Sequence, residues 1–300
     1  MDSEQLAIWK DKKEQLKKTA EKYANKEGRN TINFWRTNPL DQWPGKESWA
    51  RKKQRHIPDD FDDNVYLRML YPDAESDLFL CRLLEEKKNG SPYFAKNLPD
   101  SLRKKEVYNT WIGEKMPKEI DLVVLSNILL YKVENKIVWN RSDSLSLTYI
   151  ENTYRYCAKW KKGKLLSPQY GHYSTILYHV SRLKEQLPKW EIDTEFLLSA
   201  LQAEWTKSRD TVEKSMIGSA IYRLNSSPSE SWDPTGFSGE SDFAFFYANA
   251  GSVFPRPLNK IIASIPAYFM PYQCGGLNYF LVWEYSMLKK KREFKTNSLH

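Results

Sequence analysis

Apolar residues recur at helical spacing over much of the chain. Each such segment has an apolar face and a charged face, as in helices that pack against a core. Asp73 stands where an N-cap residue is expected, and Asn89-Gly90 follows where the same helix would end. Helices are therefore predicted over residues 3–25, 73–88, 144–161, 172–187 and 192–224.

Two adjoining segments have the clearest strand pattern. Residues 119–125 and 128–138 are rich in Ile, Val, Leu and Tyr, and Ser126-Asn127 between them suits a tight hairpin turn. Side chains two apart on one strand share a face, and so do opposed residues on neighbouring strands. The hairpin would gather Asp121, Glu134 and Lys136 on one polar patch, unless a longer turn shifts the register.

These elements predict an α/β (α+β) fold, with a mixed central sheet flanked by helices. Residues 29–63 are expected to form an irregular connection, and residues 225–239 a long exposed loop. Residues 243–285 favour short strands and turns, and a frayed basic tail follows them. Three parts are predicted: an N-terminal segment over 1–63, a core over 64–165, and a helical, aromatic-rich extension over 166–300.

Composition narrows the class of protein. The 300 residues are 41% hydrophobic, which excludes a disordered chain, and the net charge of +8 favours a polyanionic partner such as nucleic acid. Cys81, Cys157 and Cys274 lack CxxC spacing, which argues against a disulfide framework or a structural zinc and favours the cytoplasm. No stretch approaches the roughly 18 apolar residues of a membrane span, so no membrane partner is expected.

The polar patch of the predicted hairpin has the composition of a metal site. Clustered carboxylates repel one another, and a divalent cation compensates that repulsion. Asp121 and Glu134 would bind Mg²⁺, with Mn²⁺ able to replace it, and Lys136 would orient the attacking water. The Glu-x-Lys triplet recurs at Glu85, Glu86 and Glu293, but only Glu134 is predicted in a strand that follows another. The alternative is a solvated polar face.

The residues Glu119-Ile120-Asp121 and Val133-Glu134-Asn135-Lys136-Ile137 resemble the PD-(D/E)xK nuclease superfamily. The resemblance covers roughly residues 73–160, about a third of the chain. It implies a restriction-endonuclease-like core in which Asp121, Glu134 and Lys136 are catalytic.

The same resemblance extends to the two flanking helices. It implies that Glu75, early in the preceding helix, is a further catalytic carboxylate. A first-turn glutamate is as well explained by the helix dipole, and Glu85, Glu86 and Glu106 are rivals. Asn152 and Tyr156 keep the spacing of the family's Gln-x-x-x-Tyr motif, which implies contact with nucleic acid.

The function expected from the sequence is metal-dependent hydrolysis of phosphodiester bonds for restriction, phage defence or repair. DNA is favoured as the substrate, and a nuclease acting on RNA is an alternative. The basic run over residues 49–55, with Lys52, Lys53 and Arg55, would contact phosphates, although a solvated face explains it too. The alternative is a non-catalytic nucleic-acid-binding or assembly protein with the same fold. The sequence also leaves a homodimer open.

Overall fold

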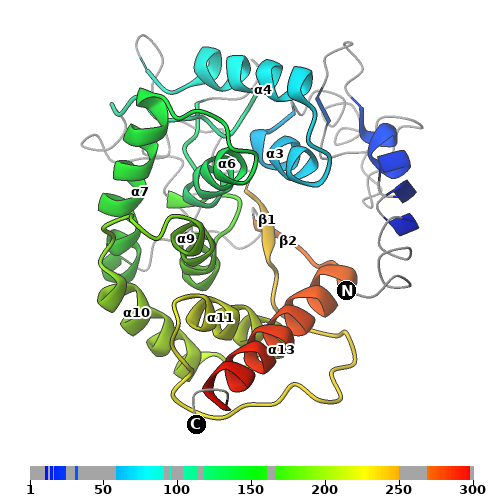
Figure 1. The fold of residues 1–300 in the computed structure, drawn as a ribbon, viewed down its shortest axis with the longest axis vertical. Coiled ribbons are helices and arrows are strands. Elements are labelled where there is room, and N and C mark those ends of the chain that lie inside the picture. The colour runs from blue at the N-terminus through cyan, green and yellow to red at the C-terminus, as the bar shows by residue number, and fades with distance from the viewer. Residues whose placement is uncertain are drawn as a thin grey trace.

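The computed structural model describes residues 11–24 except 13 and 16, 31–32, 59–90, 95, 104–113, 118–160, 166–249 and 269–297. The predicted phosphate-binding residues Lys52, Lys53 and Arg55 lie outside these ranges. Helices dominate the described residues (Figure 1). They are α3 (Phe61–Leu70), α4 (Ala74–Lys87), α6 (Leu122–Glu134), α7 (Arg141–Trp160), α9 (Tyr173–Gln186), α10 (Thr194–Lys207), α11 (Thr211–Arg223) and α13 (Gly275–Asn297), with a 3-10 turn, η1 (Glu21–Tyr23).

An inner row of helices, α3, α6, α9 and α11, runs in one direction. Ser174 near the start of α9 donates to Glu213 near the start of α11 at 2.7 Å. Glu185 and Arg223 form an ion pair where the same two helices end. Asp121 at the start of α6 accepts the Gln169 amide just before α9, and Asn135 at the end of α6 donates to the Arg68 carbonyl near the end of α3. Starts therefore lie beside starts and ends beside ends, so the four N-termini share one side of the molecule.

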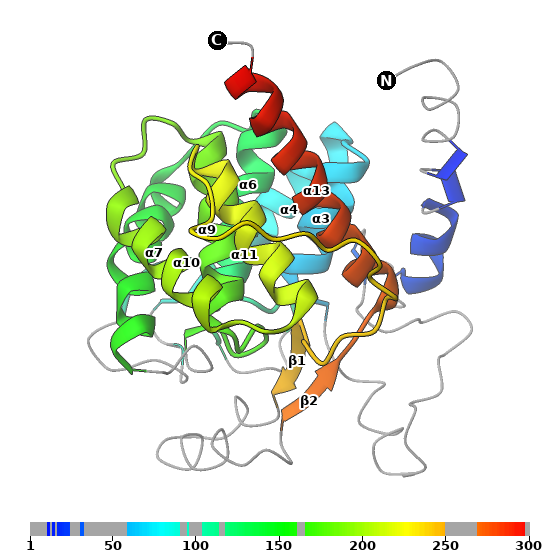
Figure 2. The same cartoon turned by 90° about the horizontal axis from the view of Figure 1, so that it is seen from below.

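The outer helices α4, α7 and α10 each follow an inner helix and turn back along its outer side, while α13 packs on α11 (Figure 1). Strands β1 (Phe246–Asn249) and β2 (Phe269–Tyr272) form an antiparallel ribbon. The Tyr247 amide of β1 donates to the Gln169 carbonyl, just before α9, at 2.8 Å. The ribbon therefore lies where the inner helices begin, apart from the outer layer (Figure 2).

The predicted mixed central sheet is wrong. Residues 122–134 form the single helix α6, and the described residues contain only the two-stranded β1–β2 ribbon. Every residue from Leu122 to Lys132 is buried, so α6 has no polar face from which a helical period could be read. A buried helix and a buried strand share such an apolar run, and its Val and Ile content favoured the strand.

Most of the helix predictions are confirmed, with shifted ends. Asp73 caps α4 as expected, since its side chain accepts the Ser76 amide at 2.9 Å. The helix predicted over 192–224 is interrupted, because Asp210 caps a new helix, α11. The tail predicted to fray is helical to Asn297, and α3 was not predicted. One cluster of buried apolar side chains includes both Phe61 and Tyr285, while the predicted division into three parts stays a prediction.

The helix α13 packs closely against α11 at Gly218. Tyr285 of α13 stacks on Trp205 of α10, with ring centroids 6.2 Å apart. Gly218 of α11 leaves the room for both rings, since a Cβ there would overlap the Tyr285 ring and lie 2.9 Å from Trp205. A bare backbone position therefore sets how tightly α13 docks.

Gly218→Ala should destabilise the protein by about 1–3 kcal/mol, the usual cost of overpacking a core. Gly275→Ala is the matched control, because a Cβ at the start of α13 meets nothing within 4 Å. Urea unfolding of both variants measures the difference. Equal stabilities would contradict the close packing of α13 on α11.

Candidate functional site

A chain of buried polar side chains links the inner helices α3, α6 and α9. Asn127, in the middle of α6, donates to Asp62 Oδ1 of α3 at 2.7 Å. Its carbonyl Oδ1 lies 2.8 Å from His179 Nδ1 of α9. All three residues are at most 6% exposed. The chain joins three separate helices through one side-chain amide.

This arrangement determines the tautomer of His179. The Asp62 carboxylate requires a donor, so the Asn127 amide nitrogen faces Asp62 and its oxygen faces the imidazole. The His179 Nδ1 must then carry the proton, which leaves a bare lone pair on Nε2. Burial, together with the charge of Arg182, lowers the pKa of His179 well below its ordinary value, so the ring is neutral.

The Nε2 atom of His179 is buried and has no hydrogen-bond partner among the described residues. Other buried polar atoms share this property, among them Trp205 Nε1 and Ser219 Oγ. Those are an indole N–H and a hydroxyl, which do not act as bases near neutral pH. A neutral imidazole does, and an unmet acceptor in a dry site is costly unless something else satisfies it.

Tyr170 places a proton donor beside the same histidine. Its phenol donates a hydrogen bond to Asp62 Oδ2, and its ring centroid lies 6.0 Å from that of His179. Burial raises the pKa of Asp62 and that of the Tyr170 phenol. The Phe245 ring, next to β1, lies 5.7 Å from His179 and 5.8 Å from Tyr170 and covers both. Tyr170 and His179 therefore lie in one aromatic enclosure, which they form with Phe245.

A second run of charged groups continues from this enclosure towards α13. Arg182, one turn beyond His179, donates to the Tyr66 hydroxyl at 3.2 Å and lies over the Tyr178 ring. Tyr178 in turn donates to Glu284 at 2.9 Å, and Glu284 pairs with Arg223 at 2.6 Å. These partners hold Arg182 as a cation, and its charge helps to keep His179 neutral.

A separate buried ion pair lies near the other end of α6. Lys132 Nζ is 2.7 Å from Asp143 of α7, and both side chains are at most 2% exposed. Tyr108 donates to the same carboxylate at 2.7 Å. Every charge here has a partner, so the cluster holds α6 against α7 and offers no open group to a ligand.

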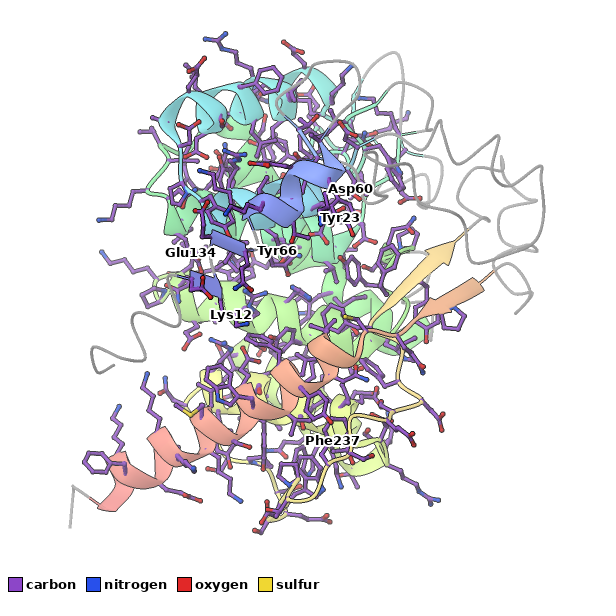
Figure 3. All side chains as sticks on the ribbon, turned by 90° about the vertical axis from the view of Figure 1, so that its right-hand side faces the viewer. Lys12, Tyr23, Asp60, Tyr66, Glu134 and Phe237 are labelled. Atoms are coloured by element: carbon purple, nitrogen blue, oxygen red, sulfur yellow. The ribbon has the colours of Figure 1, made fainter. Side chains whose placement is uncertain are left out.

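The predicted metal ligands lie at opposite ends of α6. Asp121 is the N-cap residue and accepts the Val123 and Val124 amides, while Glu134 is the last helical residue and is exposed. Thirteen residues at about 1.5 Å each separate them by about 20 Å. Figure 3 labels Asp60, where the inner helices begin, and Glu134, where α6 ends. The structure does not bring Asp121 and Glu134 together.

The remaining predicted site residues are also dispersed. Lys136 lies in the turn after α6, and Glu75 is exposed in the first turn of α4. Asn152 is exposed on α7 and donates to the Thr148 carbonyl, and Tyr156 lies on the same helix. Within the described ranges, no three His, Cys, Asp or Glu side chains are placed to hold a metal ion.

Asp121 and Lys136 both have structural roles that the sequence pattern concealed. Asp121 also accepts from the Ser167 hydroxyl and from the Gln169 amide, so it joins α6 to the loop before α9. Lys136 has a φ of 54° and follows the helix end as a C′ residue: Ile137 N donates to the Lys132 carbonyl at 2.8 Å. Asp121 caps the start of α6, and Lys136 stands in the turn that ends it.

The sequence did contain a sign of the observed site. Ser126 and Asn127 are the only non-apolar residues of the run from Leu122 to Tyr131, and they were interpreted as a turn. Two polar residues inside an apolar run also mark a buried polar contact in a helix. Ser126 bonds to the Leu122 carbonyl of its own helix, whereas Asn127 reaches Asp62 and His179. Those partners are distant in sequence, so no local pattern reveals them.

A surface groove of about 480 Å³ lies elsewhere, between the residues around η1 and the end of α3. Lys17, Glu21, Arg68 and Asp73 line it with charges of both signs. It contains none of the residues around His179.

No protein-family model, no curated protein and no solved structure matches the chain. Among the described residues, no helix has both the length and the apolar character needed to cross a membrane.

Asp121 should make stability depend on pH. Burial raises its pKa from 3.8 to about 7, so the folded state holds a proton that the unfolded chain releases. Its contribution is full below the unfolded pKa and is lost as the pH rises through about 7. The loss is a few kcal/mol at most, since one pKa unit corresponds to about 1.4 kcal/mol.

Urea unfolding across that pH range should show a smaller loss in Asp121→Asn than in the parent. Asp73→Asn is the control. The pKa of this exposed capping carboxylate is lowered, so removing it cannot reduce the loss of stability that accompanies the rise in pH. Parallel curves for the parent and Asp121→Asn would show that Asp121 ionises normally.

Lys136→Gly should stabilise the protein by about 0.5–1 kcal/mol, because glycine adopts a positive φ without the Cβ penalty. Asn225→Gly is a suitable comparison, since asparagine at its φ of 58° already tolerates this region. Thermal unfolding of both variants measures the effect. Destabilisation by Lys136→Gly would mean that the lysine side chain makes a stronger contact than its exposed position indicates.

Proposed function

We propose that the protein is an acid–base enzyme in which His179 accepts a proton from a substrate hydroxyl or from water. One observation carries this proposal: the Nε2 lone pair of His179 is buried, is held in one tautomer, and lacks a partner among the described residues. A bound hydroxyl would supply the missing hydrogen bond. A base within hydrogen-bond reach of a hydroxyl is the first requirement of general base catalysis.

Tyr170 and Asp62 supply the acid in this proposal. Tyr170 donates to Asp62, and burial raises the pKa of each group above its ordinary value, so the pair holds its proton more firmly than the free side chains do. The rings of Tyr170 and His179 have centroids 6.0 Å apart, so a substrate would contact both at their edges rather than lie between them. Two groups whose surroundings push their pKa values apart suit paired proton transfer.

The surroundings favour a hydroxylated, uncharged substrate such as a carbohydrate. Phe245, Tyr170 and Tyr178 present rings around His179, and sites that combine aromatic walls with a few polar groups bind small organic molecules. The reaction class that fits is hydrolysis or elimination at a C–O bond. Entry to His179 requires Phe245 to move, because its ring packs against both the base and the acid.

Metal-dependent cleavage of nucleic acid stays a prediction from the sequence. The net charge of +8 favours a nucleic-acid partner. With about 20 Å between Asp121 and Glu134, one ion could not bind both in this fold. An assay without metal separates the two proposals, because acid–base catalysis at His179 needs no divalent metal.

The test is a substrate panel of chromogenic glycosides, esters and polysaccharides, assayed with EDTA, beside plasmid and RNA cleavage with Mg²⁺ or Mn²⁺. The parent should turn over a hydroxylated substrate in EDTA. His179→Gln should lower kcat by about 10²–10⁴-fold, the usual contribution of a general base. The acid limb of the pH profile should lie below the ordinary histidine range, because the base works when unprotonated and its pKa is lowered.

His172→Gln is the matched control, since His172 lies at the start of α9 outside the Asp62–Asn127–His179 chain. Nitrogen NMR of the histidines gives an independent readout, with His179 expected as the neutral form protonated at Nδ1. Nucleic-acid cleavage that needs metal and survives His179→Gln would refute the acid–base proposal. So would turnover that is equal in the parent and in His179→Gln.

A further inference from the structure

The outward face of α13 is apolar, whereas the outward face of an ordinary surface helix is polar. Leu281, Tyr285 and Glu284 are buried against the body of the protein. On the opposite side, residues at spacings of three, four and seven fall on one line along the helix. They are exposed, large and apolar: Phe280 (49%), Trp283 (57%), Met287 (49%) and Phe294 (78%).

These four side chains form a ridge along α13. The rings of Phe280 and Trp283 touch, with centroids 5.9 Å apart. From Phe280 to Phe294 the ridge is about 21 Å long, at about 1.5 Å per residue. Figure 3 shows α13 on the outside of the molecule, with no described helix over it. A contiguous exposed apolar surface of this kind marks an interaction site.

Positive charge accompanies the ridge. Lys290 and Lys291 are exposed and, at helical spacing, lie beside the line from Met287 to Phe294. A parallel pair of ridges would bring these lysines against their own counterparts, so their charge opposes that form of self-association. An anionic partner that also accepts apolar side chains satisfies both features.

From these features we propose that the ridge of α13 docks on the surface of a membrane that contains anionic lipids. Phe280, Trp283, Met287 and Phe294 would enter the boundary between headgroups and acyl chains, while Lys290 and Lys291 reach lipid phosphates. Trp is favoured at that depth. The convex shape of the ridge suits a soft planar surface, whereas single-stranded nucleic acid binds along charged grooves.

Such docking needs no membrane-spanning segment. The expectation of no membrane partner was based on the absence of a spanning segment, and docking at the surface by α13 departs from it. The proposal is independent of the chemistry at His179, since the ridge lies on the outer side of α13 and shares no residue with that site.

The test is co-sedimentation of the full chain with vesicles of phosphatidylcholine alone and of phosphatidylcholine mixed with phosphatidylserine. Binding should require phosphatidylserine and weaken with added salt. Lys290→Glu with Lys291→Glu should lower partitioning at least roughly thirtyfold, at about 1 kcal/mol per lysine. Phe280→Ser with Trp283→Ser should lower it at least about tenfold.

Two double variants control for charge and for exposed apolar area. Lys104→Glu with Lys105→Glu makes the same charge change at exposed residues outside α13. Leu78→Ser with Val138→Ser removes apolar side chains that are 55% and 87% exposed elsewhere. Both should bind as the parent does, and circular dichroism should show that all four variants fold.

Three results would overturn the proposal. The first is equal binding to neutral and anionic vesicles, or no binding to either. The second is a dimer in solution that Phe280→Ser with Trp283→Ser converts to a monomer, which would identify the ridge as a contact between copies. The third is a single-stranded oligonucleotide that binds and is lost in the same variants, with no vesicle binding.

Discussion

The fold depends on the burial of α6 from Leu122 to Lys132. The helices α3, α7 and α9 pack against it, so water cannot satisfy the polar side chains of that stretch. The apolar residues of α6 form the centre of the core, and its backbone polar groups bond within the helix. The polar side chains of α6 are few, and each needs a hydrogen-bond partner on another element or within α6. The positions of the neighbouring helices follow from those partners.

The polar side chains of α6 meet this requirement in different ways. Asp121 reaches the loop before α9, and Lys132 reaches Asp143 of α7. Both contacts are closed, because Asp121 accepts hydrogen bonds from a hydroxyl and backbone amides and Lys132 pairs with a carboxylate, and they join α6 to the elements beside it. Asn127 differs because its carbonyl oxygen bonds to His179, and the Nε2 atom of that histidine has no hydrogen-bond partner among the described residues. Replacing one partner of a closed contact would mainly affect stability, whereas the open one is where chemistry is expected.

The sequence predicted amphipathic helices well and the central helix badly, for one physical reason. The helices α4 and α9 have a wet face and a dry face, so their period is visible in the residues. The run from Leu122 to Tyr131 has no solvent-exposed face, so its local residue pattern does not distinguish a strand from a helix. The site was lost with it, since Asn127 was interpreted as a turn and Asp121 as a metal ligand. Which residues meet His179 depends on contacts across more than fifty positions, which no spacing reveals.

The shared direction of the inner helices also affects which substrate can approach them. Four helix N-termini on one side of the molecule would attract an anion, since each carries partial positive charge. Three of these termini are already capped by carboxylates, with Asp60 on α3, Asp121 on α6 and Asp210 on α11. Their side chains occupy the amides that a phosphate would otherwise bind. The positive charge on this side of the molecule is therefore compensated from within, which favours an uncharged ligand there over a polyanion.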